Sequence, residues 1–302
     1  MKNPFFQEMS AGVRAILFGA LILVCAAAGS MAVIALGMSN GYSAEEIKSI
    51  IEVPRPEHIE LIKWMNNLSQ ISTFLLPVGI YLIIFGAPNA FRANMSPGFG
   101  FVLLSILWMA FSGGVIDGSA RINEWLIPQG SILEQWFLPT EKRAEEFTYM
   151  ILDFNGMGSL ISTFFCIALI PAICEELAFR GVLQPLLIGA TKNIHAGVWL
   201  AAFVFSFFHF QFYGFLPRLI LGAMLGYIFV WSGGLWVSIV AHLVNNALAI
   251  AIFHYNGMSL KSPEGDIQNS VWFIAVSVAI FAGVGYLLWK KRIPQSGWLL
   301  ES

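Results

Sequence analysis

The sequence CEELAFRG, from Cys174 to Gly181, interrupts an otherwise apolar stretch of the chain. No charged residue occurs in residues 157–173, and apolar residues resume at Val182. Two carboxylates and a guanidinium therefore fall within a segment that is long enough and apolar enough to span a membrane. Ionisable groups at that depth are costly, so they face the interior of a helix bundle and mark functional sites. The octapeptide predicts a membrane bundle with a polar site inside it.

The composition of the whole chain agrees with this prediction. Of its 302 residues, 57% are hydrophobic and 11% are charged, whereas a soluble domain has roughly 25% charged residues. The net charge is −2 and there is no basic patch with interleaved aromatic residues. We therefore expect the protein to lie in a lipid bilayer and to bind no nucleic acid. The cysteines Cys25, Cys166 and Cys174 lie in apolar runs without C-x-x-C spacing, which indicates packing residues rather than disulfides or a metal site.

Eight apolar runs are long enough to be membrane helices, which predicts an all-α polytopic membrane protein with a single integral membrane domain over residues 1–302. The first run is too long for the apolar core of a cleaved signal peptide, and we expect it to be a retained helix. The sixth begins beside Pro217 and has the least certain start. The runs are residues 15–38, 68–86, 98–116, 157–186, 196–213, 216–232, 235–254 and 271–289.

Two long segments separate the early runs. Residues 39–67 are polar, and Ser43-Ala44-Glu45-Glu46 within them is typical of a helix N-terminus with a capping box. Residues 117–155 carry Trp125 and Trp136 among acidic and basic residues. This mixture predicts amphipathic helices that lie at the membrane interface.

The basic residues Lys290-Lys291-Arg292 follow the last run directly and favour a cytoplasmic C-terminus. Eight spans then place the N-terminus on the same side. The short loops and the lack of a long cytosolic domain are compatible with a bacterial chain, so we expect the bacterial inner membrane. The two long segments, which would lie outside, carry both acidic and basic residues, so the charge bias is modest.

Few ionisable groups lie inside the apolar runs. The fourth run holds Glu175, Glu176 and Arg180, the fifth holds His209, and the seventh holds His242, with Asn245 and Asn246 close behind. Arg218 lies at a helix end, where we expect its side chain to extend to the interface.

Helix geometry separates the roles of the charged residues. Glu176 and Arg180 are four residues apart, so they share a helix face and are predicted to form an ion pair. Glu175 is rotated by about 100° from Glu176, which leaves its carboxylate available for chemistry. His242 and Asn246 also share a face.

The polar residues also fall at similar depths. With a rise of about 1.5 Å per residue, Glu175 lies roughly 16 Å, His209 roughly 20 Å, His242 roughly 10 Å and Asn246 roughly 16 Å from helix ends on one membrane face. A single such residue would be explained as a hydrogen-bond partner between helices. A matched set on three helices instead predicts one shared cavity.

A buried carboxylate with an imidazole beside it can take a proton from water, and a second imidazole with an amide can stabilise an oxyanion. That chemistry predicts an endopeptidase acting on a peptide or protein substrate that enters from the membrane. Glu175, His209 and His242 could alternatively bind Zn²⁺, although no His-Glu-x-x-His occurs. A serine enzyme fits less well, because Ser206 is the sole weak candidate nucleophile. A transporter or a non-enzymatic scaffold is a further alternative.

The motifs Glu175-Glu176-x-x-x-Arg180, Phe205-x-x-x-His209 and His242-x-x-x-Asn246 resemble those of the CAAX protease and bacteriocin-processing (CPBP) family. These are intramembrane glutamic endopeptidases related to the type II CAAX prenyl endopeptidases. The resemblance covers residues 157–254, which we regard as the catalytic core.

By position, the resemblance implies that Glu175 and His209 activate water. It implies an oxyanion site of His242 and Asn246, with Glu176 and Arg180 as structural support, and no metal cofactor. For a bacterial chain, it suggests peptide maturation or bacteriocin self-immunity as the biological process.

Overall fold

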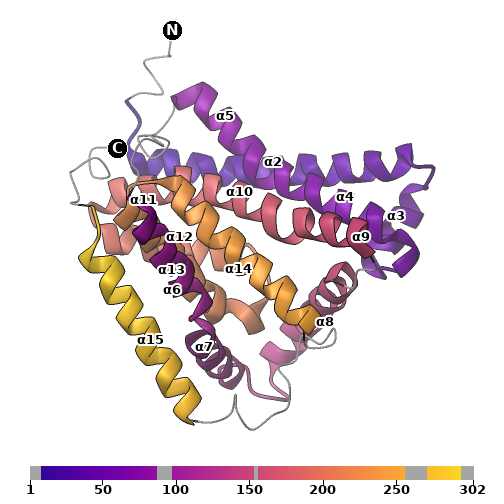
Figure 1. Ribbon diagram of the computed structural model, residues 1–302. Coiled ribbons are helices and arrows are strands. Elements are labelled where there is room, and N and C mark those ends of the chain that lie inside the picture. The colour runs from indigo at the N-terminus through magenta and orange to yellow at the C-terminus, as the bar shows by residue number, and fades with distance from the viewer. Residues whose placement is uncertain (1–7, 87–96, 153–155, 256–270, 294–302) are drawn as a thin grey trace.

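The computed structural model describes residues 8–86, 97–152, 156–255 and 271–293, and every regular element within these ranges is helical (Figure 1). The α-helices are α2 (Ala11–Ser39), α3 (Ala44–Glu52), α4 (Ile59–Gln70), α5 (Leu76–Phe85), α6 (Phe99–Ala110), α7 (Gly113–Trp125), α8 (Ile132–Leu152), α9 (Gly156–Thr163), α10 (Ile170–Glu176), α11 (Gln184–Thr191), α12 (Ile194–Phe207), α13 (Phe215–Ser232), α14 (Leu235–Tyr255) and α15 (Val271–Lys290). Wider π-helical turns are η2 (Ile71–Leu75), η4 (Phe164–Leu169) and η5 (Leu177–Leu183), and the 3₁₀ turns are η1 (Pro56–His58) and η6 (Phe212–Gly214).

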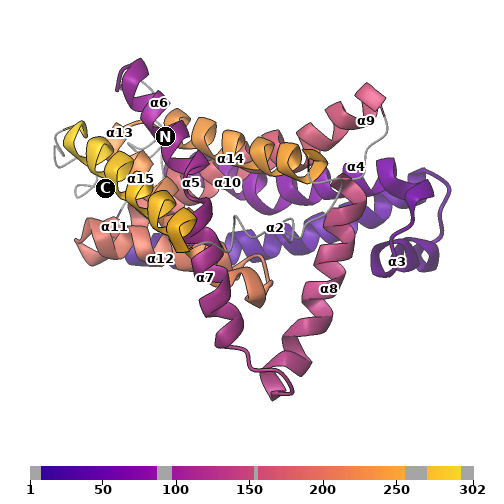
Figure 2. The same ribbon diagram turned by 60° about the horizontal axis from the view of Figure 1, so that its bottom comes forward.

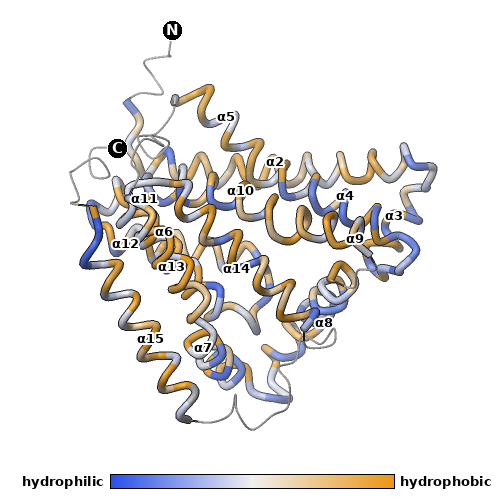
Figure 3. Tube along the Cα trace, viewed as in Figure 1, coloured by the Kyte–Doolittle hydropathy of each residue, from blue (hydrophilic) through white to orange (hydrophobic). Residues whose placement is uncertain are grey.

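The predicted all-α polytopic membrane fold is confirmed. Six helical stretches in the described part of the chain are long and apolar enough to cross a membrane, and two shorter apolar helices, Ile194–Phe207 and Ile274–Lys290, fall at the fifth and eighth predicted runs. Figure 3 shows these helices as largely hydrophobic, with many of the hydrophilic residues on α3, α4, α7 and α8 and at the end of α15. The six long stretches are Ala11–Ser39, Pro56–Phe85, Phe99–Trp125, Gly156–Thr191, Phe212–Ser232 and Leu235–Tyr255.

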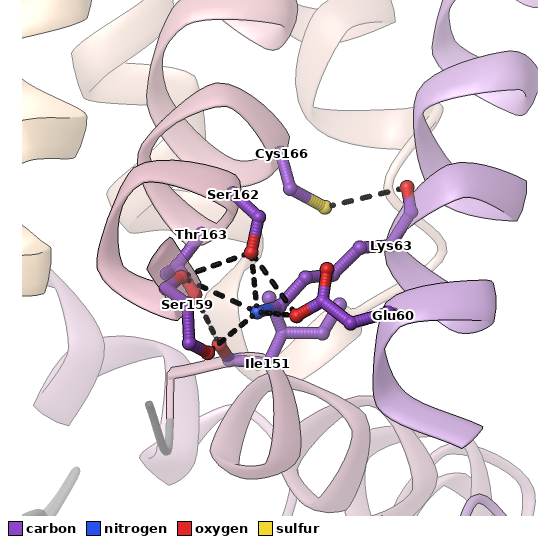
Figure 4. A network of polar contacts seen from close by, with 7 residues as sticks. All are labelled: Glu60, Lys63, Ile151, Ser159, Ser162, Thr163 and Cys166. Atoms are coloured by element: carbon purple, nitrogen blue, oxygen red, sulfur yellow. Dashed lines mark hydrogen bonds and ion pairs between the residues drawn. The ribbon is translucent and has the colours of Figure 1, made fainter. Parts of the chain in front are cut away.

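The second span begins earlier than its hydropathy predicts, at Pro56 rather than near residue 68. Polar residues of α4 extend the helix because protein groups satisfy them. Lys63 is 2% exposed, and its Nζ donates to Glu60 Oε1 at 2.9 Å, to Ser159 Oγ at 3.1 Å and to Ser162 Oγ at 2.9 Å (Figure 4). These contacts join α4 to α9, at the start of the fourth span.

The two long connecting segments contain helices, as predicted. The capping box at the start of α3 is present: Glu46 N donates to Ser43 Oγ at 3.2 Å, and Ser43 N donates to Glu46 Oε2 at 2.7 Å. Hydrogen bonds from the backbone and the side chain of Ser43 hold the pKa of the Glu46 carboxyl below its usual value. In the second segment, α7 packs against α13 and α15, α8 extends away from the bundle, and the two helices approach each other at the turn between them (Figure 2). Their place at a membrane interface stays a prediction.

The core of the bundle surrounds the fourth span. Phe18 of α2, Phe74 of η2 and Phe179 of η5 belong to one buried apolar cluster. On the other side, the backbone of α13 lies close to the fourth span at Gly226, where glycine leaves room for Gln184. A Cβ atom added to Gly226 would lie only 2.8 Å from Gln184 Oε1. The cysteines Cys25, Cys166 and Cys174 are buried and unpaired, which agrees with the predicted packing role.

Candidate active site

Glu175 lies on α10 between two wide turns of the fourth span, η4 and η5. Pro171 and Pro185 each follow one of these turns by two residues. Proline has no backbone N–H and its ring collides with the carbonyl four residues earlier, so an undisturbed α-helix is not possible there. Wide turns of this kind are frequent at functional sites, because they change the direction in which side chains project.

Glu176 and Arg180 form the ion pair that their spacing predicts. Arg180 Nη1 donates to Glu176 Oε1 at 2.6 Å, and the two side chains are 1% and 0% exposed. Arg180 Nη2 donates to the carbonyl of Gly222 on α13 at 2.6 Å, and its guanidinium lies 5.1 Å from the ring centre of Phe205. The pair therefore anchors the fourth span to α13 as well as balancing a buried charge.

His242 lies between the two carboxylates. Its Nδ1 is 3.0 Å from Glu176 Oε1, and its Nε2 is 3.9 Å from Glu175 Oε2. A carboxylate accepts hydrogen bonds, which places a proton on Nδ1 and directs Nε2 towards Glu175. Glu176 thus fixes the orientation and the tautomer of the imidazole, in addition to its predicted pairing with Arg180.

His209 differs from its predicted position because α12 ends at Phe207, whereas the sequence suggested a helix continuing to residue 213. The backbone amides that follow α12 donate to the carbonyls three residues earlier: His209 N donates to Ser206 O, and Phe210 N donates to Phe207 O. Phe210 then adopts a positive φ of 51°, which ends the helix. The imidazole is nevertheless fixed, since His209 Nδ1 lies 2.9 Å from the carbonyl of Phe205. A carbonyl only accepts, so Nδ1 carries the proton and Nε2 is left as an acceptor.

Asn246 satisfies a backbone carbonyl in the fourth span. Its Nδ2 donates to the carbonyl of Ile167 at 3.2 Å. In an α-helix that carbonyl would accept from residue 171, which is a proline here and has no N–H. Asn245 Nδ2 in turn donates to Asn246 Oδ1 at 3.3 Å. The Asn246 amide is therefore held against the fourth span by its hydrogen bond to the Ile167 carbonyl, to which Pro171 cannot donate.

These side chains meet at one cavity of about 670 Å³. All four residues predicted to be catalytic contribute to its wall, whereas Glu176 and Arg180 are not among the wall residues. The polar wall residues are Asn66, Gln70, Arg143, Thr148, Glu175, His209, Gln211, Arg218, His242, Asn245 and Asn246. A carboxylate, two imidazoles and an amide from α10, the turn after α12, and α14 thus share one cavity within an apolar bundle.

Several polar wall residues were not predicted, among them Gln70 and Arg218. Gln70 reaches the Glu175 carboxylate from the second span; a polar amide within an apolar run was the available signal. Arg218 was expected to extend to the interface, and its position relative to the membrane stays a prediction. Its side chain turns inward to the cavity, where it donates to both the backbone and the side-chain carbonyl of Gln211. Its closeness to a helix end in the sequence does not reveal that direction.

Ser206 is not on the cavity wall. It is 1% exposed, and its hydroxyl donates to the carbonyl of Phe215 at 2.6 Å. Among the described residues, no group of three His, Cys, Asp or Glu side chains has the arrangement of a metal site.

Known proteins resemble part of this chain. Residues 157–248 match the family model described as Type II CAAX prenyl endopeptidase Rce1-like. The uncharacterized protein YpbD of Bacillus subtilis (strain 168) is 31% identical over 86 residues, which are 27% of this chain and 41% of that relative. The chain thus matches less than half of that relative's length. No solved structure matches the chain. Glu175, His209, His242, Asn246 and the Glu176–Arg180 pair all lie within residues 157–248, the segment that matches the Rce1-like model of type II CAAX prenyl endopeptidases.

Proposed function

We propose that this protein is an intramembrane endopeptidase in which Glu175 and His209 activate a water molecule. The observation that carries the proposal is the shared cavity of about 670 Å³, which brings Glu175, His209, His242 and Asn246 together. Such groups are costly inside a membrane bundle, so they are rare there and mark functional sites. The match to a family of membrane endopeptidases supports the same reaction class.

In the proposed reaction, the Glu175 carboxylate takes a proton from water while the oxygen of that water attacks the carbonyl carbon of the peptide bond. His209 Nε2 is an acceptor, because Nδ1 is engaged with Phe205 O, and it orients the second proton of the water. The tetrahedral intermediate then collapses. The bond between carbon and nitrogen breaks, and Glu175 returns its proton to the leaving amine.

His242 and Asn246 form the proposed oxyanion site, and their contacts define how they act. Glu176 engages His242 Nδ1, so Nε2 donates to the oxyanion when the ring is an imidazolium. The Glu176 carboxylate stabilises that charge, in the way that an aspartate supports histidine in serine proteases. Asn246 uses one amide N–H on Ile167 O and keeps a second N–H for the oxyanion.

The test is cleavage of a peptide delivered in detergent micelles or liposomes. Glu175→Gln keeps the shape of the side chain but cannot accept the proton, so we expect the cleavage rate to fall by at least a factor of about 100. Glu52→Gln is the matched control, since that carboxylate is exposed on α3 and its replacement should leave the rate unchanged. Full activity of Glu175→Gln would exclude the mechanism.

The same assay separates the alternatives. Activity that persists in excess chelator is expected for the proposed mechanism, whereas loss on chelation with recovery on adding Zn²⁺ would favour a zinc enzyme built on Glu175, His209 and His242. Proton-coupled flux in liposomes without any proteolysis would favour a transporter. The proposed substrates are peptides or proteins that enter the cavity from the bilayer, with peptide maturation as the proposed process.

A further inference from the structure

The turn that carries His209, residues 208–214, is held by a helix that is distant in sequence. Asn123 of α7 is 4% exposed. Its Nδ2 donates to the carbonyl of Phe212 at 2.6 Å, and its Oδ1 accepts from the amide of Leu216 at 2.9 Å. One buried amide thus satisfies two backbone groups, one in the turn and one in the first turn of α13.

This turn contains a conformation that it would not adopt easily alone. Phe210 has a φ of 51°, in the left-handed region where the Cβ of a non-glycine residue is disfavoured. The Phe210 side chain is 54% exposed, so it gains little from packing in the protein interior. Such a conformation persists where its surroundings fix it, and it is typical of functional sites.

Other contacts fix the same turn from several directions. The ring of Phe137, from α8, stacks on Phe212 with centres 4.1 Å apart. Arg218 Nη1 donates to the carbonyl of Gln211 at 2.9 Å, and Ser206 bridges the base of the turn to Phe215 O. The rings of Phe74 and Phe179 contact Phe208 at the start of the turn, whereas the contacts that Phe212 receives from outside residues 200–220 come from α7 and α8.

We propose that Asn123 is a positioning residue of the active site, which holds the backbone of the 208–214 turn so that His209 lies at the cavity wall. Phe137 of α8 supports the same turn. The segment from α7 to α8 thereby acquires a role in the reaction, although it lies outside the matched residues 157–248. This inference rests on the proposed function of His209, since the turn itself contributes no other proposed catalytic group.

The kinetic test uses Asn123→Leu, which fills a similar volume and makes neither bond. Misplacement of His209 should lower kcat by about tenfold to a hundredfold, while KM changes little. In the His209→Ala background, Asn123→Leu should cause no further loss, because the side chain acts through His209. The matched control is Gln184→Leu, which removes another buried amide that donates to the backbone of α13, at Gly226, and should leave kcat within twofold.

Asn123→Asp provides a milder variant should Asn123→Leu fail to fold. It keeps the acceptor for the Leu216 amide and loses the donor to Phe212 O. Its kcat should therefore lie between that of the wild type and that of Asn123→Leu. An equal loss of kcat for Asn123→Leu with and without His209 would overturn the proposal.

A second measurement does not depend on proteolysis. In protein labelled with ¹⁵N-histidine, the ring signals of His209, assigned by their loss in His209→Ala, should shift or broaden in Asn123→Leu and stay in place in Gln184→Leu. Unchanged His209 signals in Asn123→Leu would refute the positioning role. If the wild type cleaves no peptide but the signals shift, the proposed enzyme is wrong and the positioning of His209 stands.

Discussion

Glu175 and Glu176 are neighbours of the same chemical type with different surroundings. Glu176 is shared by Arg180 and His242 Nδ1, whereas Glu175 faces the cavity and approaches His242 Nε2 at 3.9 Å. A spacing of four residues was enough to predict the Glu176–Arg180 pair, because that contact is local to one helix. The contact between His242 and Glu176 joins residues 66 positions apart, and no local pattern encodes it.

Removal of Arg180 should be strongly destabilising. Arg180→Met leaves the Glu176 carboxylate buried beside His242 without its main counter-charge, which costs about 3–5 kcal/mol. We expect a lower thermal unfolding midpoint in detergent micelles, measured by circular dichroism. The double variant Glu176→Gln/Arg180→Met removes both charges and should recover part of the loss. A single variant as stable as the wild type would contradict the buried ion pair.

At the scale of the helices, hydropathy located all eight apolar runs but not the irregularities within them. The length of a membrane helix depends on the local composition, which the sequence displays directly. The end of α12 at Phe207 depends instead on Asn123, Phe137 and Arg218, which contact the following turn from other elements. The same reason applies to Asn66 and Lys63, whose partners in the fourth span allow α4 to continue the second span.

The link between Pro171 and Asn246 can be tested as a double-mutant cycle. Asn246→Leu removes the donor to Ile167 O and should destabilise the protein by about 1 kcal/mol. Pro171→Ala restores a backbone N–H that can bond the same carbonyl, so Asn246→Leu should cost less in that background. The measurement is the unfolding midpoint of the four proteins. Equal costs in both backgrounds would show that the proline and the amide act independently.

At the scale of the whole molecule, the site depends on contacts between parts of the chain that are far apart. The family match covers residues 157–248, yet the cavity wall also includes Gln70 from the second span and Arg143 from α8. The pattern of polar residues at matched depth predicted that the four residues from the fourth span to α14 share a cavity. It gave no role to the two long segments, because their residues act through contacts across the bundle.

The attachment of α4 to α9 through Lys63 gives a prediction at this scale. Lys63→Met keeps the aliphatic stem but loses the donors to Glu60, Ser159 and Ser162, and it should destabilise the protein by about 1–3 kcal/mol. Hydrogen exchange should report faster opening of α4 and α9 before global unfolding.

The matched control is Lys48→Met. The Lys48 side chain is 75% exposed, and its Nζ lies 3.9 Å from Glu52 Oε1 in a surface pair. Its stability should stay within about 0.5 kcal/mol of the wild type. A similar effect of both variants would show that the buried contacts of Lys63 contribute no more than a surface charge does.

The wide turn η4 (Phe164–Leu169) has a consequence for how the fourth span tolerates insertions and deletions. A π-helical turn holds one more residue than an α-helical turn in the same length. Deletion of one residue there would remove the extra residue and leave the segment beyond it at nearly the same rotation, whereas deletion of one residue from α10 would rotate Glu175 by about 100° relative to α9. Glu175 would then leave the cavity while the composition and hydropathy of the helix stayed almost unchanged. The residue count between Leu169, at the end of η4, and Glu175 therefore constrains this protein more tightly than the identity of most residues between them.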